Sequence, residues 1–174
     1  MREPICPCLQ MPSVQTVTRF VILQHQLETM KPTNTARIAH LAMPNSEIVT
    51  YGVEQLDFEA VAPAGTWLLY PDGEEPPPSS DRPSRMLVLD GNWTQTRRML
   101  HRLPELRRLP RLSLSPAKPD RLRMRQQRDP AGMSTLEAIA QAVSQLEGPQ
   151  KGALLDLLHD GMTERVMRAR GLIR

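Results

Sequence analysis

Short apolar runs and longer periodic segments follow one another along the chain. Five short runs, rich in β-branched residues, have the length and composition of strands: 17–24, 48–51, 66–70, 85–89 and 112–115. Four longer segments are predicted as helices from their capping residues and periodic apolar positions: 36–43, 93–103, 134–146 and 154–166. The pattern therefore predicts a chain in which strands alternate with helices.

The central strand runs are almost continuously apolar, which indicates that both faces of the sheet are buried. Together with the intervening helices, this predicts an α/β fold in which one domain contains a mainly parallel sheet. A length of 174 residues suits a single domain with a full core. We expect residues 1–16 to be an N-terminal extension and the proline-rich stretch 71–84 to be a surface loop within the domain.

In such a sheet, ligands bind beyond the carboxyl ends of the strands, so the residues directly after each strand are candidates for chemistry. Asp90 ends a buried strand and can accept a proton there. The alternative is a turn carboxylate that bonds to nearby backbone N–H groups. Trp93 can stack on a base or an adenine, or it can pack in the core.

The starts of the predicted helices give a second group of candidates. Asn92 with Gln95, and Ser134 with Glu137, have the three-residue spacing of capping boxes. A helix start also favours an anionic group, so Ser134 and Thr135 suit a ligand carboxylate. Capping alone is the better supported reading of these residues.

Further polar residues follow the first strand. His25 and Glu28 are candidates for a proton relay or a metal pair, although two ligands three residues apart are a weak signal. Lys31, Asn34 and Thr35 suit a carboxylate or phosphate at the start of the next helix. Helix capping would also explain Asn34 and Thr35.

Charge is distributed unevenly along the chain. The net charge is only +3, but the segment 97–128 carries +9 and the remainder −6. Concentrated arginine is typical of proteins that contact a polyanion, because the guanidinium group binds phosphate in a bidentate manner. We therefore expect contact with nucleic acid, with a merely solvated basic surface as the alternative.

Motifs and composition exclude several classes of function. The chain has no G-x-x-x-x-G-K-[ST], no G-x-G-x-x-G and no H-E-x-x-H. Hydrolysis of nucleoside triphosphates and redox chemistry with a dinucleotide are therefore unsupported. No apolar run approaches the roughly 18 residues of a membrane span, and the N-terminus lacks the order of a signal peptide, so we expect a cytoplasmic protein without a membrane partner. Cys6 and Cys8 are too few for a structural zinc site, so no metal is expected.

Six stretches, in order along the chain, resemble the DTW-domain family. They are 6–8 (CPC), 25–35 (HQLETMKPTNT), 69–71 (LYP), 90–93 (DGNW), 121–123 (RLR) and 134–138 (STLEA). No single stretch is decisive, but together they extend over nearly the whole chain.

The resemblance implies a SPOUT-like fold with a C-terminal trefoil knot that binds S-adenosylmethionine. It also implies transfer of the 3-amino-3-carboxypropyl group of this cofactor to N3 of a tRNA uridine, with release of methylthioadenosine and with Asp90 as the general base. We expect the cofactor near nine residues: Leu69, Tyr70, Pro71, Trp93, Leu114, Arg123, Arg125, Ser134 and Thr135. We expect tRNA near ten others: His25, Glu28, Lys31, Asn34, Thr35, Arg97, Arg98, Arg107, Arg108 and Arg111.

The chain departs from the family pattern in two places. The usual Asp-x-Thr-Trp is here Asp90-Gly91-Asn92-Trp93, in which Asn92 keeps an oxygen that can cap a helix. Longer relatives carry two earlier cysteines that complete a four-cysteine metal site. Two alternatives therefore stay open: an RNA methyltransferase that uses the same cofactor, and an RNA-binding module without catalysis. The oligomeric state is also open.

Overall fold

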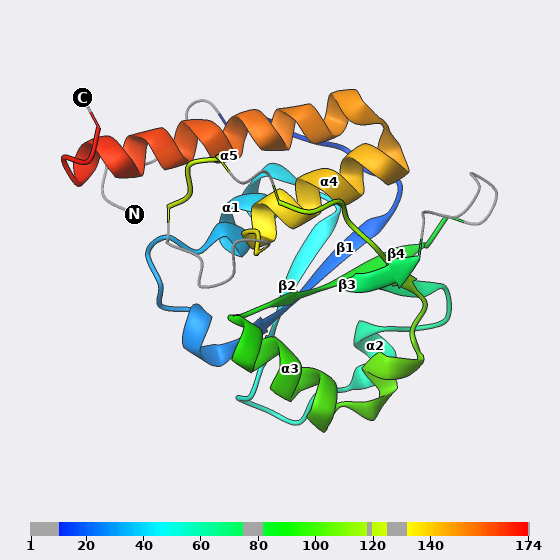
Figure 1. Cartoon of the computed structure of the whole chain (residues 1–174). Helices are drawn as coiled ribbons and strands as arrows, with labels where there is room; N and C mark the ends of the chain where they lie inside the picture. The colour runs from blue at the N-terminus through cyan, green and yellow to red at the C-terminus, as the bar shows by residue number, and fades with distance from the viewer. Residues whose placement is uncertain (1–10, 75–81, 118–119, 125–131, 174) are drawn as a thin grey trace.

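A computed structural model describes residues 11–74, 82–117, 120–124 and 132–173 (Figure 1). At its centre is a five-stranded sheet with the order β2-β1-β4-β3-β5. The strands are β1 (Arg19–His25), β2 (Ser46–Tyr51), β3 (Thr66–Glu74), β4 (Arg85–Asp90) and β5 (Arg111–Leu112). All neighbouring strands pair in parallel, so the predicted α/β fold with a parallel sheet is confirmed.

Helices cover both faces of the sheet, as Figure 1 shows. The first face carries α1 (Thr35–Ala42), α4 (Thr135–Glu147) and α5 (Pro149–Ala169). The second face carries α2 (Phe58–Val61), α3 (Trp93–Arg102) and the 3-10 helix η5 (Pro104–Arg108). A short 3-10 helix, η3 (Gln26–Glu28), follows β1.

Alternate residues of the central strands contribute to two separate cores. Phe20 and Ile22 of β1 belong to the core that contains α1, α4 and α5. Val21 and Leu23 belong to the core on the α3 side. All four side chains have 0% exposure. Burial on both faces explains why this strand is continuously apolar in the sequence.

The boundary of β3 differs from its prediction. The loop expected at 71–84 begins later, because Pro71 and the residues up to Glu74 continue the strand. Pairing between β3 and β4 covers only Thr66 to Leu69. Pro71 lies beyond that ladder and has no β4 hydrogen bond to lose, which is where a strand tolerates proline.

The buried face of α5 agrees with its prediction only in part. The apolar positions of the sequence predict a buried face made of five residues: Leu154, Leu157, Leu158, Met162 and Val166. The last three are buried, but Leu154 and Leu157 are 44% and 69% exposed, and Leu155 is buried instead. No helix in the described ranges, α5 included, is long and apolar enough to cross a membrane.

Both predicted capping boxes are present, and both fix the start of a long helix. The Asn92 side chain accepts from Gln95 N, while the Gln95 side chain accepts from Asn92 N (3.0 and 2.6 Å). Ser134 and Glu137 exchange the same pair of bonds at the start of α4. Because Asn92 caps α3 fully, replacement of the family's threonine leaves the helix start intact.

A tight connection brings α4 and α5 together. Gly148 ends α4 with φ of 108°, a backbone conformation that favours glycine, and Pro149 begins α5. One turn later, a Cβ atom on Gly152 would lie 2.6 Å from Ser144 Cβ and 2.7 Å from Ala140 O. The absence of a side chain at Gly152 therefore permits the two helices to touch backbone to backbone.

Candidate active site

A cavity of about 590 Å³ opens at the carboxyl ends of the strands. The connections after β1 and β4 leave these adjacent strands toward opposite edges of the sheet, which is the position where open parallel sheets bind ligands. The lining comes from parts of β3 and β4, from the segments after β1, β4 and β5, from the start of α4 and from His159 of α5. Its volume is within the range of small-molecule sites, roughly 300–1,000 Å³.

Asp90 is the last residue of β4 and is held from three other elements. Its Oδ2 accepts from Gln24 Nε2 of β1 (2.9 Å) and from Asn34 Nδ2 before α1 (3.0 Å), and its Oδ1 accepts from Thr135 Oγ1 of α4 (2.6 Å). The residue is 5% exposed and lines the cavity. A carboxylate has about four acceptor positions, so roughly one is left for a ligand.

Asn34 links this carboxylate to the helix that follows. Its Oδ1 accepts from Arg37 N (2.8 Å) and caps α1, while its Nδ2 donates to Asp90. Both ends of the amide are thus used, which fixes its orientation. The predicted capping role of Asn34 is present, and the same side chain also contacts the candidate base, a contact that sequence reasoning did not predict.

Apolar and aromatic side chains form the opposite wall of the cavity. Leu69, Pro71 and Leu114 line it together with Tyr70 and Trp93. The Tyr70 and Trp93 rings meet edge to face with centroids 6.5 Å apart. Outside them, the Arg111 guanidinium lies 5.4 Å from the Tyr70 ring centroid. Such a wall suits a flat heteroaromatic ring.

The polar residues after β1 divide into two groups. Glu28 lines the cavity, is 3% exposed and pairs with Lys31. His25 is not among the described lining residues, because its Nδ1 accepts from Leu27 N (3.2 Å) and caps η3. The structure therefore does not bring His25 and Glu28 together as a relay.

Glu137, in the first turn of α4, is the centre of an ionic cluster. Both its oxygens lie 3.3 Å from Arg123 Nε, and Oε2 lies 3.6 Å from His159 Nε2. Burial alone would raise the pKa of Glu137, but the hydrogen bonds from Ser134 and the charges of His159 and Arg123 outweigh it. The pKa is therefore held below its usual value.

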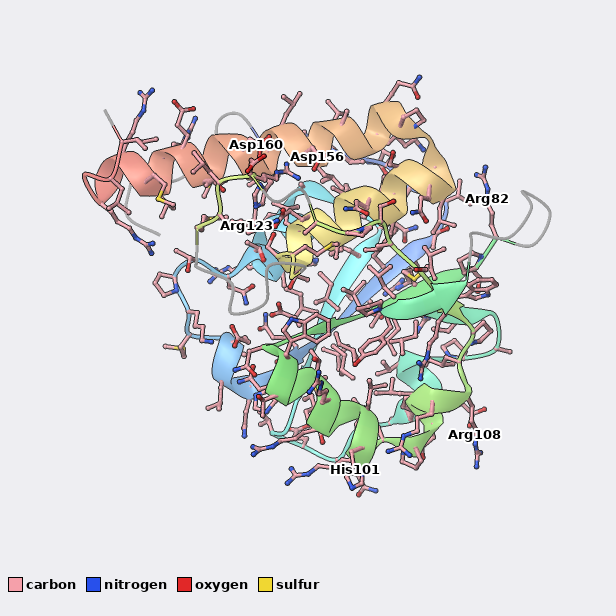
Figure 2. The ribbon with its side chains drawn as sticks, in the orientation of Figure 1. Arg82, His101, Arg108, Arg123, Asp156 and Asp160 are labelled. Atoms are coloured by element: carbon pink, nitrogen blue, oxygen red, sulfur yellow. The ribbon has the colours of Figure 1, made fainter. Side chains whose placement is uncertain are left out.

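The same cluster connects the chain before α4 to α5. Arg121 donates to Asp156 (2.7 Å) and Asp160 (2.8 Å), and Figure 2 shows both acids on α5 above Arg123. Arg123 points to Glu137 and is not among the described lining residues. Arg125, the other arginine expected at the cofactor, lies outside the described residues.

The basic residues expected to contact RNA gather on α3 and η5. Trp93 and Thr96 of α3 line the cavity, and Arg97 and Arg98 follow on the same helix, where both are exposed. Three further arginines extend this surface along the chain: Arg107, Arg108 and Arg111. Figure 2 shows His101 and Arg108 pointing outward on the side away from α5.

Most residues expected at the cofactor come together in one cavity. The lining contains seven of them: Leu69, Tyr70, Pro71, Trp93, Leu114, Ser134 and Thr135. Sequence reasoning missed Gln24 and His159. The signal for Gln24 was its position as a polar residue in an apolar strand, but nothing in the pattern marked His159.

No group of three His, Cys, Asp or Glu side chains in the described ranges is arranged to hold a metal ion. Cys6 and Cys8 lie outside these ranges.

Comparisons with known proteins agree with this geometry. The sequence model of a family described as "DTW domain" matches residues 1–167. The chain is 28% identical over 154 residues to a Drosophila melanogaster protein named tRNA-uridine aminocarboxypropyltransferase 2. The aligned region is 82% of this chain and 61% of the relative, so the chain spans about three fifths of that protein's length. No solved structure matches.

Proposed function

Because this chain belongs to the DTW-domain family, we propose that it transfers the 3-amino-3-carboxypropyl group of S-adenosylmethionine to N3 of a tRNA uridine, releasing methylthioadenosine. The observation that carries the proposal is the Asp90 carboxylate inside a cavity that has one apolar, aromatic wall and adjoins an arginine-rich helix. The fly relative's name describes the same class of reaction.

The cavity has the features that the cofactor needs. The wall around Leu69, Tyr70 and Leu114 suits the adenine ring, since it offers apolar surface and strand-end backbone groups. At the other side, Ser134 and Thr135 begin α4, whose N-terminus favours the carboxylate of the methionine arm.

The hydrogen bonds of Asp90 support a role for this carboxylate as the acceptor of the uridine proton. Three neutral donors fix its orientation and leave about one acceptor position, which suits N3–H. The bound cofactor supplies an electrophilic γ-carbon with a sulfonium leaving group. In this proposal Asp90 would hold and accept the N3 proton of the uridine, and the cofactor would supply the carbon that N3 attacks and the leaving group. The chain's main contribution is then alignment, which supplies up to roughly 7–11 kcal/mol of a barrier.

The exposed arginines of α3 and η5 suit the phosphates of tRNA. Arg97 and Arg98 lie one turn after Trp93, so RNA bound there would bring a nucleotide to the cavity. Contacts of this kind position RNA without reading its sequence.

We also propose that the chain has a SPOUT-like fold and a cytoplasmic location. The parallel sheet, with α4 and α5 following the cavity segments, is compatible with a SPOUT-like domain and C-terminal trefoil knot. One DTW domain over residues 1–174 and a cytoplasmic location accord with a tRNA-modifying enzyme.

The experiment is nucleoside mass spectrometry of unmodified tRNA incubated with the protein and S-adenosylmethionine labelled in the methionine arm. Label in an aminocarboxypropyl-uridine is the expected result. Methylated nucleosides with S-adenosylhomocysteine would instead identify a methyltransferase. RNA binding without cofactor binding would leave an RNA-binding module.

Replacement of Asp90 by Asn tests the role of the base. At saturating cofactor we expect turnover to fall by at least about 100-fold, the usual contribution of general base catalysis. Glu105→Gln, which removes an exposed carboxylate from η5, is the matched control. Turnover within threefold of the wild type in Asp90→Asn would remove Asp90 from this role.

A further inference from the structure

The charges that line the cavity are opposite in sign to those on the neighbouring surface. Among the described lining residues, Glu28 and Asp90 are acids, Tyr70 and His159 are the other titratable side chains, and none is lysine or arginine. This holds in a chain with a net charge of +3 and an arginine-rich α3 beside the cavity. The interior of the site is therefore suited to a cation, although its surroundings suit a polyanion.

The two acids differ in their partners. Glu28 forms an ion pair with Lys31. Within the part of the chain that the structure describes, Asp90 accepts from the neutral groups of Gln24, Asn34 and Thr135, and no lysine, arginine or histidine there forms an ion pair with it. Hydrogen bonds from neutral donors orient a carboxylate but leave its net charge in place. A buried charge of this kind is costly unless an opposite charge pairs with it.

We propose that Asp90 is the counter-charge by which the cavity selects the cationic form of its cofactor over the neutral thioethers that resemble it. This inference rests on the proposed use of S-adenosylmethionine, whose sulfonium is a permanent cation. Attraction between opposite charges is stronger at a buried site than in water, because screening is weaker there. Asp90 thus acts in specificity as well as in proton transfer.

The proposal has a consequence for product release. Asp90 takes the N3 proton, the bond between N3 and the γ-carbon forms, and the carbon–sulfur bond breaks with its electron pair left on sulfur. Both the carboxylate and the sulfonium lose their charge in the same reaction. The attraction that held the cofactor is then absent from the product state, so methylthioadenosine is held less tightly and leaves.

The test compares two ligands that differ by one methyl group and one positive charge, S-adenosylmethionine and S-adenosylhomocysteine. Isothermal titration calorimetry gives the dissociation constant of each. The buried methyl alone accounts for about a fourfold preference. We expect a preference of about fortyfold in the wild type, in which the charge contributes about tenfold. In Asp90→Asn the preference should fall by about tenfold, mainly through weaker binding of the cation.

A control variant separates the charge of Asp90 from a general loss of negative charge. Glu105→Gln removes an exposed acid outside the cavity and should leave the preference unchanged. An equal loss of affinity for both ligands in Asp90→Asn would overturn the proposal, and so would an equal fall of the preference in Glu105→Gln.

A measurement on the wild-type protein keeps the test independent of any variant's folding. The dimethylsulfonium analogue of methylthioadenosine is compared with methylthioadenosine itself, a pair that lacks the amino-acid arm. A preference clearly above about fourfold supports the counter-charge, and a preference at or below about fourfold overturns it. If neither S-adenosylmethionine nor S-adenosylhomocysteine binds, the proposed function itself fails.

Discussion

Replacement of Gly152 by alanine should loosen the contact between the last two helices. An added Cβ would lie 2.6 Å from Ser144 Cβ, 2.7 Å from Ala140 O and 2.9 Å from Ser144 Cα. All three distances are shorter than carbon and oxygen atoms tolerate, and two of them involve main-chain atoms of α4. No side-chain rotation relieves such contacts, so α5 has to move away from α4.

Two opposing effects determine how much the free energy of unfolding changes in Gly152→Ala. Overpacking of a well-packed interface costs about 1–3 kcal/mol, and contacts with main chain belong at the upper end. Alanine is about 1 kcal/mol better than glycine within a helix, which offsets part of that cost. The free energy of unfolding should therefore fall by about 2 kcal/mol. For a domain of this size the melting temperature should fall by about 4–8 °C.

Gly161→Ala provides the matched control, because the same substitution is made in the same helix where an added Cβ meets nothing within 4 Å. It should raise the free energy of unfolding by about 1 kcal/mol through helix propensity alone. Thermal and urea unfolding of both variants, followed by circular dichroism, make the comparison. If Gly152→Ala were as stable as Gly161→Ala, the close approach of α4 and α5 inferred at Gly152 would be incorrect.

Two further predictions concern the ionic cluster and the basic surface. The lowered pKa of Glu137 means that its ionised form adds stability above about pH 4.5, and that this stability is lost as the pH falls through the lowered pKa. Glu137→Gln should cost about 3 kcal/mol near neutral pH and make urea midpoints less dependent on pH, and an unaltered pH dependence would contradict this. Arg98→Ala should weaken tRNA binding and reduce the salt slope by about one unit, whereas Arg168→Ala on α5 should change neither, as filter binding at several salt concentrations would reveal.

Sequence patterns predicted the sheet and the starts of α1, α3 and α4 well, because these depend on local residues, whereas α5 begins at Pro149, before the predicted start at 154. Continuous apolar runs indicate burial on both faces, and a capping box needs only two residues three apart, as at Asn92 and Gln95. The face of α5 was predicted less well. Leu158, Met162 and Val166 are buried as predicted, but Leu154 and Leu157 are exposed, because the apolar pattern alone does not determine which side of the helix packs against α4 near Gly152.

The site was predictable in part for a similar reason. Asp90 is marked by its position at the end of a strand, and Thr135 by its position at a helix start. Their 2.6 Å hydrogen bond joins residues 45 positions apart, and no local pattern encodes it. Gln24 and Asn34 converge on the same carboxylate from a third and a fourth segment. Such convergence is a product of tertiary folding. The family resemblance brought Asn34, Asp90 and Thr135 together as candidates but did not include Gln24.

The hydrogen bonds that converge on Asp90 also have a consequence for synthesis on the ribosome. Gln24, Asn34 and Asp90 all precede Thr135 in the chain, so a nascent polypeptide that ends before α4 lacks the donor to Asp90 Oδ1 and the helix that closes the cavity. Because α4 packs against α5 and His159 of α5 lines the cavity, the cavity is completed only after α5 has been translated. The catalytic competence that we propose therefore requires α5, and a nascent chain that stops before α4 lacks part of the proposed site.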